Sequence, residues 1–149
     1  MAGGASDAHR PGQAIGLAQT VVRARSLSRT AILDGLREGH SYVTGSSGLD
    51  LRMTAAAGKR SALIGDHLAA APGQPVTVRL RVRGATGAVA GFFTEDGPRF
   101  TAPLLDADET VSFTTTAAES RYVRAEVRRL DKVMLGLTNP IFLSERARP

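Results

Sequence analysis

Histidines and a nearby carboxylate are the side chains of this 149-residue chain whose types and spacing best suit chemistry. His9 stands two positions after Asp7. On an extended segment, residues i and i+2 point to the same side, so this imidazole and this carboxylate could reach one metal ion. The combination suits Zn, Mn or Fe. A solvated loop would carry the same pair, and a catalytic metal needs at least three protein ligands. The pair alone therefore predicts an incomplete metal site.

The other two histidines have simpler structural interpretations. His40 follows Gly39 at the expected end of a helix, where a protonated imidazole interacts favourably with the helix dipole. His67 follows Asp66, but adjacent side chains usually diverge and the sequence offers no third member of a catalytic set. We therefore expect a capping or exposed role for His40 and no catalytic role for His67.

Alternating arginines give a second candidate surface. Three of them share one face of an expected strand (Arg79, Arg81 and Arg83), and two share one face of another (Arg124 and Arg128). If the two strands are neighbours, they form a basic stripe that could bind an anionic polymer, with an affinity that falls steeply with salt. The alternative is a solvated sheet face whose arginines pair with nearby acidic residues at little energetic consequence. The acidic candidates are Asp106, Glu119 and Glu126.

The composition limits the classes of function. The net charge is +5, and the basic residues are 17 Arg against 2 Lys, a ratio that also fits the codon usage of a GC-rich genome. No Cys is present, which excludes disulfides, Cys–zinc sites and thiol nucleophiles. Trp is absent and aromatics are 5%, which disfavours base stacking, so nucleic acid is not the expected partner. No apolar run of membrane-spanning length is present, and residues 1–7 lack signal-peptide features, so we expect a cytoplasmic protein.

Short strands dominate the pattern that must position these residues. The clearest is residues 76–83, where Val and Leu alternate with Thr and Arg, as in a half-buried antiparallel strand. Residues 55–71 have small side chains and no clean period, so we expect a loop there with a short helical turn at 66–71. The other expected strands cover residues 19–24, 40–44, 49–54, 88–94, 99–104, 111–113, 123–127 and 141–143.

One helix is expected, over residues 29–38. Ser28 suits the N-cap, Leu27 before it could pack on Ile32 as a hydrophobic staple, and Gly39 supplies the C-terminal stop. From residue 41 onward about seven short strands follow one another, separated by turn signals. The expected fold is therefore mainly β, an immunoglobulin-like antiparallel β-sandwich with one short α-helix on its N-terminal side.

Several short motifs, taken in order, carry a resemblance to a known family. They are Ser6-Asp7-Ala8-His9-Arg10-Pro11, Ile15-Gly16, Thr20-Val21-Val22, the segment 27–39, Ser41-Tyr42-Val43, and the ending Leu135-Gly136-Leu137-Thr138-Asn139-Pro140-Ile141-Phe142. Together they resemble the final section of polymerase-and-histidinol-phosphatase (PHP) family enzymes, within a bacterial branch of metal-dependent hydrolases that carries a C-terminal β-sandwich. The resemblance implies that residues 1–44 are the end of a PHP-type barrel and that residues 45–149 are the sandwich.

The resemblance also implies a chemistry that this chain does not complete. Asp7 and His9 match the family's late Ser-Asp-x-His motif, whose Asp and His bind a divalent metal, and the family hydrolyses phosphate esters with metal-activated water. The family's early His-x-His pair is missing from this sequence. We therefore expect a C-terminal piece of a longer or split protein, inactive alone, with a structural or assembly role.

Three alternatives remain open at this stage. The chain could associate with itself to cover the apolar face of its helix. It could complete the metal site of a separate barrel-bearing chain. It could instead be a stand-alone module that binds an anionic polymer through the Arg-bearing sheet face.

Overall fold

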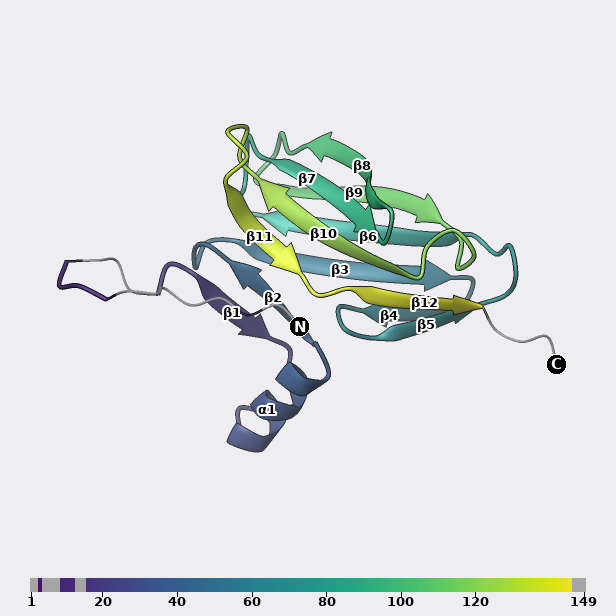
Figure 1. Cartoon of the computed structure of the whole chain (residues 1–149), viewed down its shortest axis with the longest axis horizontal. Helices are drawn as coiled ribbons and strands as arrows, with labels where there is room; N and C mark the ends of the chain where they lie inside the picture. Colours follow the sequence, from purple (N-terminus) through teal and green to yellow (C-terminus); the bar gives the residue numbers. More distant parts are fainter. Residues whose placement is uncertain (1–2, 4–8, 13–15, 146–149) are drawn as a thin grey trace.

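Two packed β-sheets make up most of the molecule, with one helix at the end where the N-terminal strands lie (Figure 1). The structure, a computed structural model, describes residues 3, 9–12 and 16–145. The expected mainly β sandwich with one short helix is confirmed. Its specific likeness to immunoglobulin domains stays a prediction. No helix of the described residues has the length and hydropathy of a membrane span.

The larger sheet has eight strands. Its main path runs β1-β2-β11-β10-β12-β5, and β7 pairs with the other edge of β10 and with β8. All pairings are antiparallel except that of β12 with β5, which is parallel. The strands are β1 (Gln19–Val22), β2 (Ser41–Thr44), β5 (His67–Ala70), β7 (Val89–Thr94), β8 (Gly97–Pro103), β10 (Tyr122–Arg128), β11 (Met134–Thr138) and β12 (Ile141–Glu145).

The smaller sheet is a regular antiparallel ladder of four strands in the order β4-β3-β6-β9. The strand over residues 76–83 matches the alternation in the sequence, because its Val and Leu side chains all point inward and its arginines all point outward. The strands are β3 (Asp50–Ala57), β4 (Arg60–Leu63), β6 (Val76–Arg83) and β9 (Asp108–Thr115).

The core lies between the two sheets. Leu51, Met53 and Leu80 of the small sheet and Val123 of the large sheet are almost completely buried and belong to one cluster. Phe92 of β7 stacks on Phe113 of β9 with ring centroids 5.7 Å apart, which joins the sheets at the far end from the helix. A continuous core of this kind fixes which face of each strand meets solvent, and so positions the arginines of β6 on the outer face of the small sheet.

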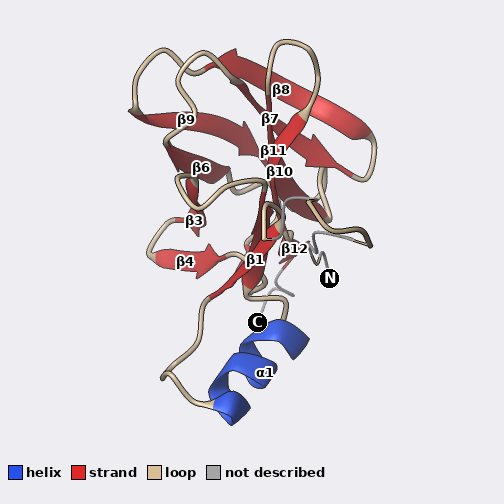
Figure 2. Cartoon of the chain, turned by 90° about the vertical axis from the view of Figure 1, so that its left-hand side faces the viewer, coloured by secondary structure: helices blue, strands red, loops and turns tan. Residues whose placement is uncertain are grey.

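The first two strands and the helix form a unit at one end of the sandwich, hereafter the β1–α1–β2 unit (Figure 2). α1 (Arg29–Arg37) begins as expected, with Ser28 accepting a hydrogen bond from the Ala31 backbone N–H. Gly35 is the helix's one buried residue, and a Cβ atom there would lie 2.6 Å from the Arg23 carbonyl oxygen, so only glycine fits this close contact. The expected staple is wrong, since Leu27 is 99% exposed.

The region of residues 55–71 is not the loop that the sequence predicted. β3 continues to Ala57, and β4 and β5 follow as short strands. Alanines supply most of the inward side chains here, with Ala57 at the end of β3, Ala62 on β4 and Ala70 on β5, so the hydrophobic alternation is weak although the inward faces are buried. β11 was also missed. Among the described residues eleven strands begin at or after residue 41, so the estimate of about seven was too low.

The expected division at residue 44 falls in the turn between β2 and β3. β2 nevertheless pairs with β11, with Val43 opposite Leu137, so the strand before this boundary belongs to the larger sheet. Two hydrogen bonds strengthen the link: the Asn139 side-chain amide donates to Ser41 Oγ at 2.9 Å, and the Asn139 backbone N–H donates to the Ser41 carbonyl at 3.2 Å.

Candidate functional site

An apolar groove opens between the β1–α1–β2 unit and the small sheet. Its volume is about 420 Å³, and its walls come from β1, β2, β3 and β4. Leu51, Met53 and Ile64 supply apolar lining. Polar groups stand along it, Arg23 and His40 from the unit and Asp50 from β3. A concave apolar surface with a few polar groups is the usual form of a binding site, so this groove is the first candidate.

A cluster of charged residues, hereafter the Asp66 cluster, holds the unit to the sandwich beside this groove. Asp66 lies between β4 and β5, and its Oδ1 atom accepts from Arg23 at 2.7 Å and lies 2.8 Å from His40 Nε2. The other ring nitrogen of His40, Nδ1, lies 3.1 Å from Glu38 Oε2. One carboxylate therefore binds a residue on each side of α1, which fixes the two connections of the helix against the sandwich.

The electrostatics of Asp66 favour its ionised form. Burial raises the pKa of this carboxyl, but a backbone hydrogen bond from Leu63 and the hydrogen bond and positive charge of Arg23 outweigh burial, so the pKa is lowered overall. The Leu63 N–H donates to Asp66 Oδ2 at 2.9 Å. Both oxygens of Asp66 are thus engaged within the protein, and the cluster is organised as a clamp.

A second polar contact lies farther along the groove. The Tyr42 hydroxyl donates to Asp50 Oδ1 at 3.2 Å, and Asp50 also accepts from Arg52 at 3.2 Å. Burial is the main cause that raises the pKa of the Tyr42 phenol. The phenol is therefore kept neutral as a hydrogen-bond donor, and it anchors β2 against the start of β3.

Metal binding is the chemistry that the sequence placed near the N-terminus. Asp7 lies outside the described residues, so the structure does not place the predicted ligand pair. His9 is exposed. Within the described part of the chain no group of three or more His, Cys, Asp or Glu side chains could hold a metal ion. The assignment of Asp7 and His9 as metal ligands stays a prediction.

The two neighbouring residues Asp66 and His67 diverge, as expected. Asp66 turns to His40, whereas the His67 ring stacks on Phe142 with centroids 4.7 Å apart. His40 does lie just beyond the end of α1, yet it binds two carboxylates and its side chain is only 19% exposed. The expectation of a capping or exposed residue missed this contact, because Asp66 is far away in the sequence.

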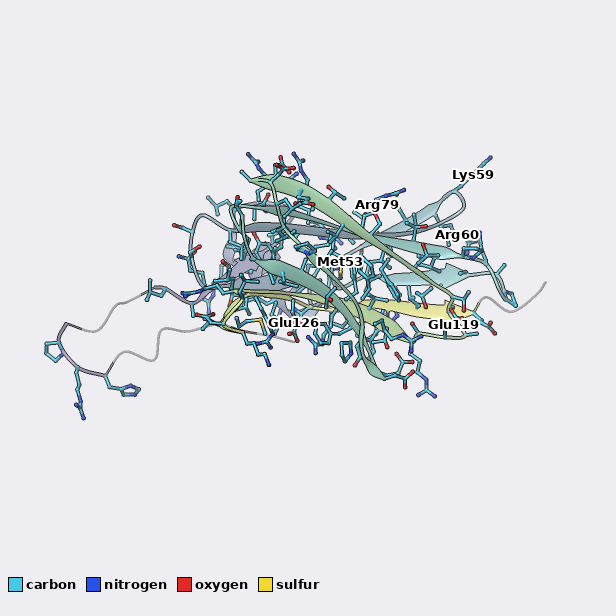
Figure 3. The ribbon with its side chains drawn as sticks, turned by 90° about the horizontal axis from the view of Figure 1, so that it is seen from above. Met53, Lys59, Arg60, Arg79, Glu119 and Glu126 are labelled. Carbon is cyan, nitrogen blue, oxygen red and sulfur yellow. The ribbon has the colours of Figure 1, made fainter. Side chains whose placement is uncertain are left out.

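The five arginines of the predicted basic stripe do not lie on neighbouring strands. β6 belongs to the small sheet and β10 to the large one, and Figure 3 shows Arg79 and Glu126 on opposite sides of the sandwich with Met53 between them. On β10, Arg124 and Arg128 both bind the buried carboxylate of Glu126. Arg124 also lies 4.7 Å above the Phe93 ring. The condition for one continuous stripe is therefore not met.

Burial and charge oppose each other at Glu126. Burial raises the pKa of its carboxyl, and the hydrogen bonds and charges of the two flanking arginines lower it by more, so the net shift is downward. This is the pairing with acidic residues that the sequence offered as the alternative, with Glu126 as one of the named partners. On the small sheet the partner is instead Asp108, which binds Arg81 at 2.5 Å and lies 3.6 Å from Arg83.

The residues that sequence reasoning missed are Arg23 and Asp66. Arg23 follows β1 directly and Asp66 sits in a tight turn, and each is an ordinary polar residue at a strand end. The sequence offered one signal: an ionisable residue stands at each strand end next to α1, Arg23 after β1 and His40 before β2. That signal does not identify the partner, because the pairing depends on the three-dimensional closure of Gly65 against Gly39.

Comparisons of the chain with protein-family models, with curated proteins and with solved structures found no match.

Proposed function

We propose that the chain is a non-catalytic β-sandwich module that packs, through its β1–α1–β2 unit, against the barrel of a PHP-type metal-dependent hydrolase. The observation that carries the proposal is the apolar surface of this unit. Gly35 is the helix's one buried residue, whereas Val21, which lines the groove, and Leu33 of α1 are each 37% exposed. Apolar surface gathered in this way is characteristic of interaction sites.

The rigidity of the unit supports the same proposal. The Asp66 cluster and the close approach of α1 to Arg23 fix the helix on the sandwich. A preorganised surface loses less freedom when it docks, which favours a lasting contact between domains. The sequence resemblance supplies the occupant, because the segment that precedes β1 carries the motif that the family uses at its barrel.

In this arrangement the chain and the barrel would each contribute ligands to one metal site. Asp7 and His9 would contribute two ligands to a Zn, Mn or Fe ion, and the barrel would contribute the others; the metal would activate water for attack on a phosphate ester. The sandwich itself would hold the last part of the site in place. Two ligands do not suffice to enclose a catalytic metal, so the chain alone would be inactive.

The first experiment measures metal content and hydrolysis. Purified chain is incubated with Zn²⁺ or Mn²⁺, dialysed, analysed for bound metal and assayed with an aryl phosphate. We expect neither a stoichiometric, chelator-sensitive metal nor turnover. A chain that retains one ion and hydrolyses the ester, with both lost in an Asp7→Ala, His9→Ala variant, would overturn the non-catalytic assignment.

The second experiment tests the surface. Without its barrel, the unit should self-associate weakly at high concentration, as measured by light scattering. Leu33→Gln should reduce this association, whereas Leu130→Gln should leave it unchanged, because Leu130 is equally apolar and 79% exposed but lies outside the unit. A monomer at every concentration, or an equal effect of both substitutions, would contradict docking through the β1–α1–β2 unit.

A further inference from the structure

The outer face of the small sheet carries a regular grid of polar side chains. Three strands contribute, and their registers place Asp50, Arg83 and Asp108 in one row. The next rows along the sheet contain Arg52, Arg81 and Thr110, then Thr54, Arg79 and Ser112, then Ala56, Thr77 and Thr114. We infer that this face, hereafter the arginine grid, binds a sulfated polysaccharide. The grid adjoins the groove at Asp50, Arg52 and Thr54, but the inference does not rest on the proposed docking of the β1–α1–β2 unit.

Two aspartates organise three of the four arginines. Asp108 accepts from Arg81 through both Nε and a terminal nitrogen, at 2.7 and 2.5 Å, and Arg83 lies 3.6 Å from the same carboxylate. Asp50 accepts from Arg52 at 3.2 Å. These contacts hold the guanidinium groups in place, yet they leave two units of positive charge over, because four arginines face two aspartates.

Arg79 is the unbalanced member of the grid. Its side chain is exposed on β6, an inner strand of the sheet, with Thr54 and Ser112 as its cross-strand neighbours. Neither an ion pair nor a side-chain hydrogen bond of Arg79 is found among the described residues. A guanidinium between two hydroxyl-bearing residues offers a planar fork for an oxyanion and additional hydrogen bonds around it.

The arrangement has a cost that folding alone does not explain. Arg52 stands directly opposite Arg81 across β3 and β6, and like charges in directly opposed positions destabilise a sheet. Successive arginines on β6 lie two residues apart, so they repeat along the strand about every 7 Å. An anionic chain laid along β6 would relieve this repulsion at each step.

The chemistry of the face favours a sulfated polysaccharide over a nucleic acid. No aromatic side chain is present among the outward residues of the grid, so bases have no surface on which to stack. The grid instead supplies five hydroxyl groups, from Thr54, Thr77, Thr110, Ser112 and Thr114, which suit sugar hydroxyls. Figure 3 shows Lys59, at the turn between β3 and β4, on the same side as Arg79.

Heparin is the probe for the test. Its affinity for the whole chain is measured by fluorescence anisotropy over a series of NaCl concentrations. Arg79→Gln should weaken binding about tenfold at low salt, because one charge-assisted contact is lost, and should lower the slope of log affinity against log salt by up to about one. The matched control is Arg25→Gln, an exposed arginine of the segment between β1 and α1.

The outcomes separate the possibilities. A loss of heparin affinity in Arg79→Gln, with little change of affinity in Arg25→Gln, supports binding at the arginine grid. Equal losses in both variants would show attraction by net charge alone and would overturn the proposal, as would no binding of heparin at low salt. A single-stranded oligonucleotide is titrated in parallel, and tighter binding of it than of heparin at equal salt would overturn the assignment to a polysaccharide. Thermal unfolding of each variant establishes that it is folded.

Discussion

Asp66→Asn is the substitution that tests most directly how the β1–α1–β2 unit is held. The amide keeps the shape of the side chain and an oxygen for the Leu63 N–H, but it removes the charge that faces Arg23 and His40. The Arg23 pair is about half exposed and should contribute about 0.5 kcal/mol, and the less exposed His40 pair about 1 kcal/mol. Unfolding free energy should therefore fall by about 1.5 kcal/mol, which lowers Tm by about 3–6 °C.

The stability that Asp66 contributes should decrease as the pH falls. The folded pKa of Asp66 is lowered, so its contribution is complete above the unfolded value of about 3.9 and is lost as the pH falls through the folded value. The Tm of the wild type should therefore exceed that of Asp66→Asn at neutral pH, and the two Tm values should converge in acid. Hydrogen exchange should locate the weakening in α1.

A surface carboxylate of the same unit provides the control. Asp34 binds Arg37 one turn away, and both side chains are half exposed or more, so Asp34→Asn should change the stability by at most about 0.5 kcal/mol. If Asp66→Asn costs no more than this control, or if the gap persists unchanged in acid, the Asp66 cluster is not what fixes the unit.

Two further substitutions test separate parts of the structure. Gly35→Ala would place a methyl group 2.6 Å from the Arg23 carbonyl oxygen. The clash should outweigh the gain in helix propensity from Ala, which is worth about 1 kcal/mol. Hydrogen exchange in α1 should therefore become faster, and slower exchange would contradict the clash. Glu126→Gln should cost about 2 kcal/mol in chemical denaturation because the buried charge holds Arg124 and Arg128. Its lowered pKa means that this difference should disappear in strong acid, and a difference retained there would refute the ionic origin.

Strong alternation of apolar and polar residues made much of the sandwich predictable. Residues 76–83 gave strand β6 with its correct faces, because each inward position holds Val or Leu and each outward position Thr or Arg. The segment 55–71 failed for the opposite reason, since alanine fills the inward position of β4 and one of the two inward positions of β5. Small side chains can be fully buried and yet contribute too little hydrophobic contrast for a pattern to emerge.

The candidate site was less predictable than the fold. The arginines of β6 were located correctly on one face, but their neighbours depend on which strands pair, and Arg52 joins them only through the register of β3 against β6. The Asp66 cluster likewise brings together residues from three separate turns and strand ends. Local sequence rules describe neither case, because both depend on contacts between distant segments.

The pairing of β2 with β11 has a consequence for synthesis and folding. Ser41 and Asn139, which bond across this junction, are 98 residues apart. As the chain leaves the ribosome, β2 can pair with β1 at once, but its other neighbour, β11, exists only after almost the whole sandwich has been made. Contacts of such long range slow folding and leave earlier segments uncovered in the meantime. The side of β2 that later pairs with β11 therefore stays uncovered during most of synthesis, unless a chaperone or another segment shields it.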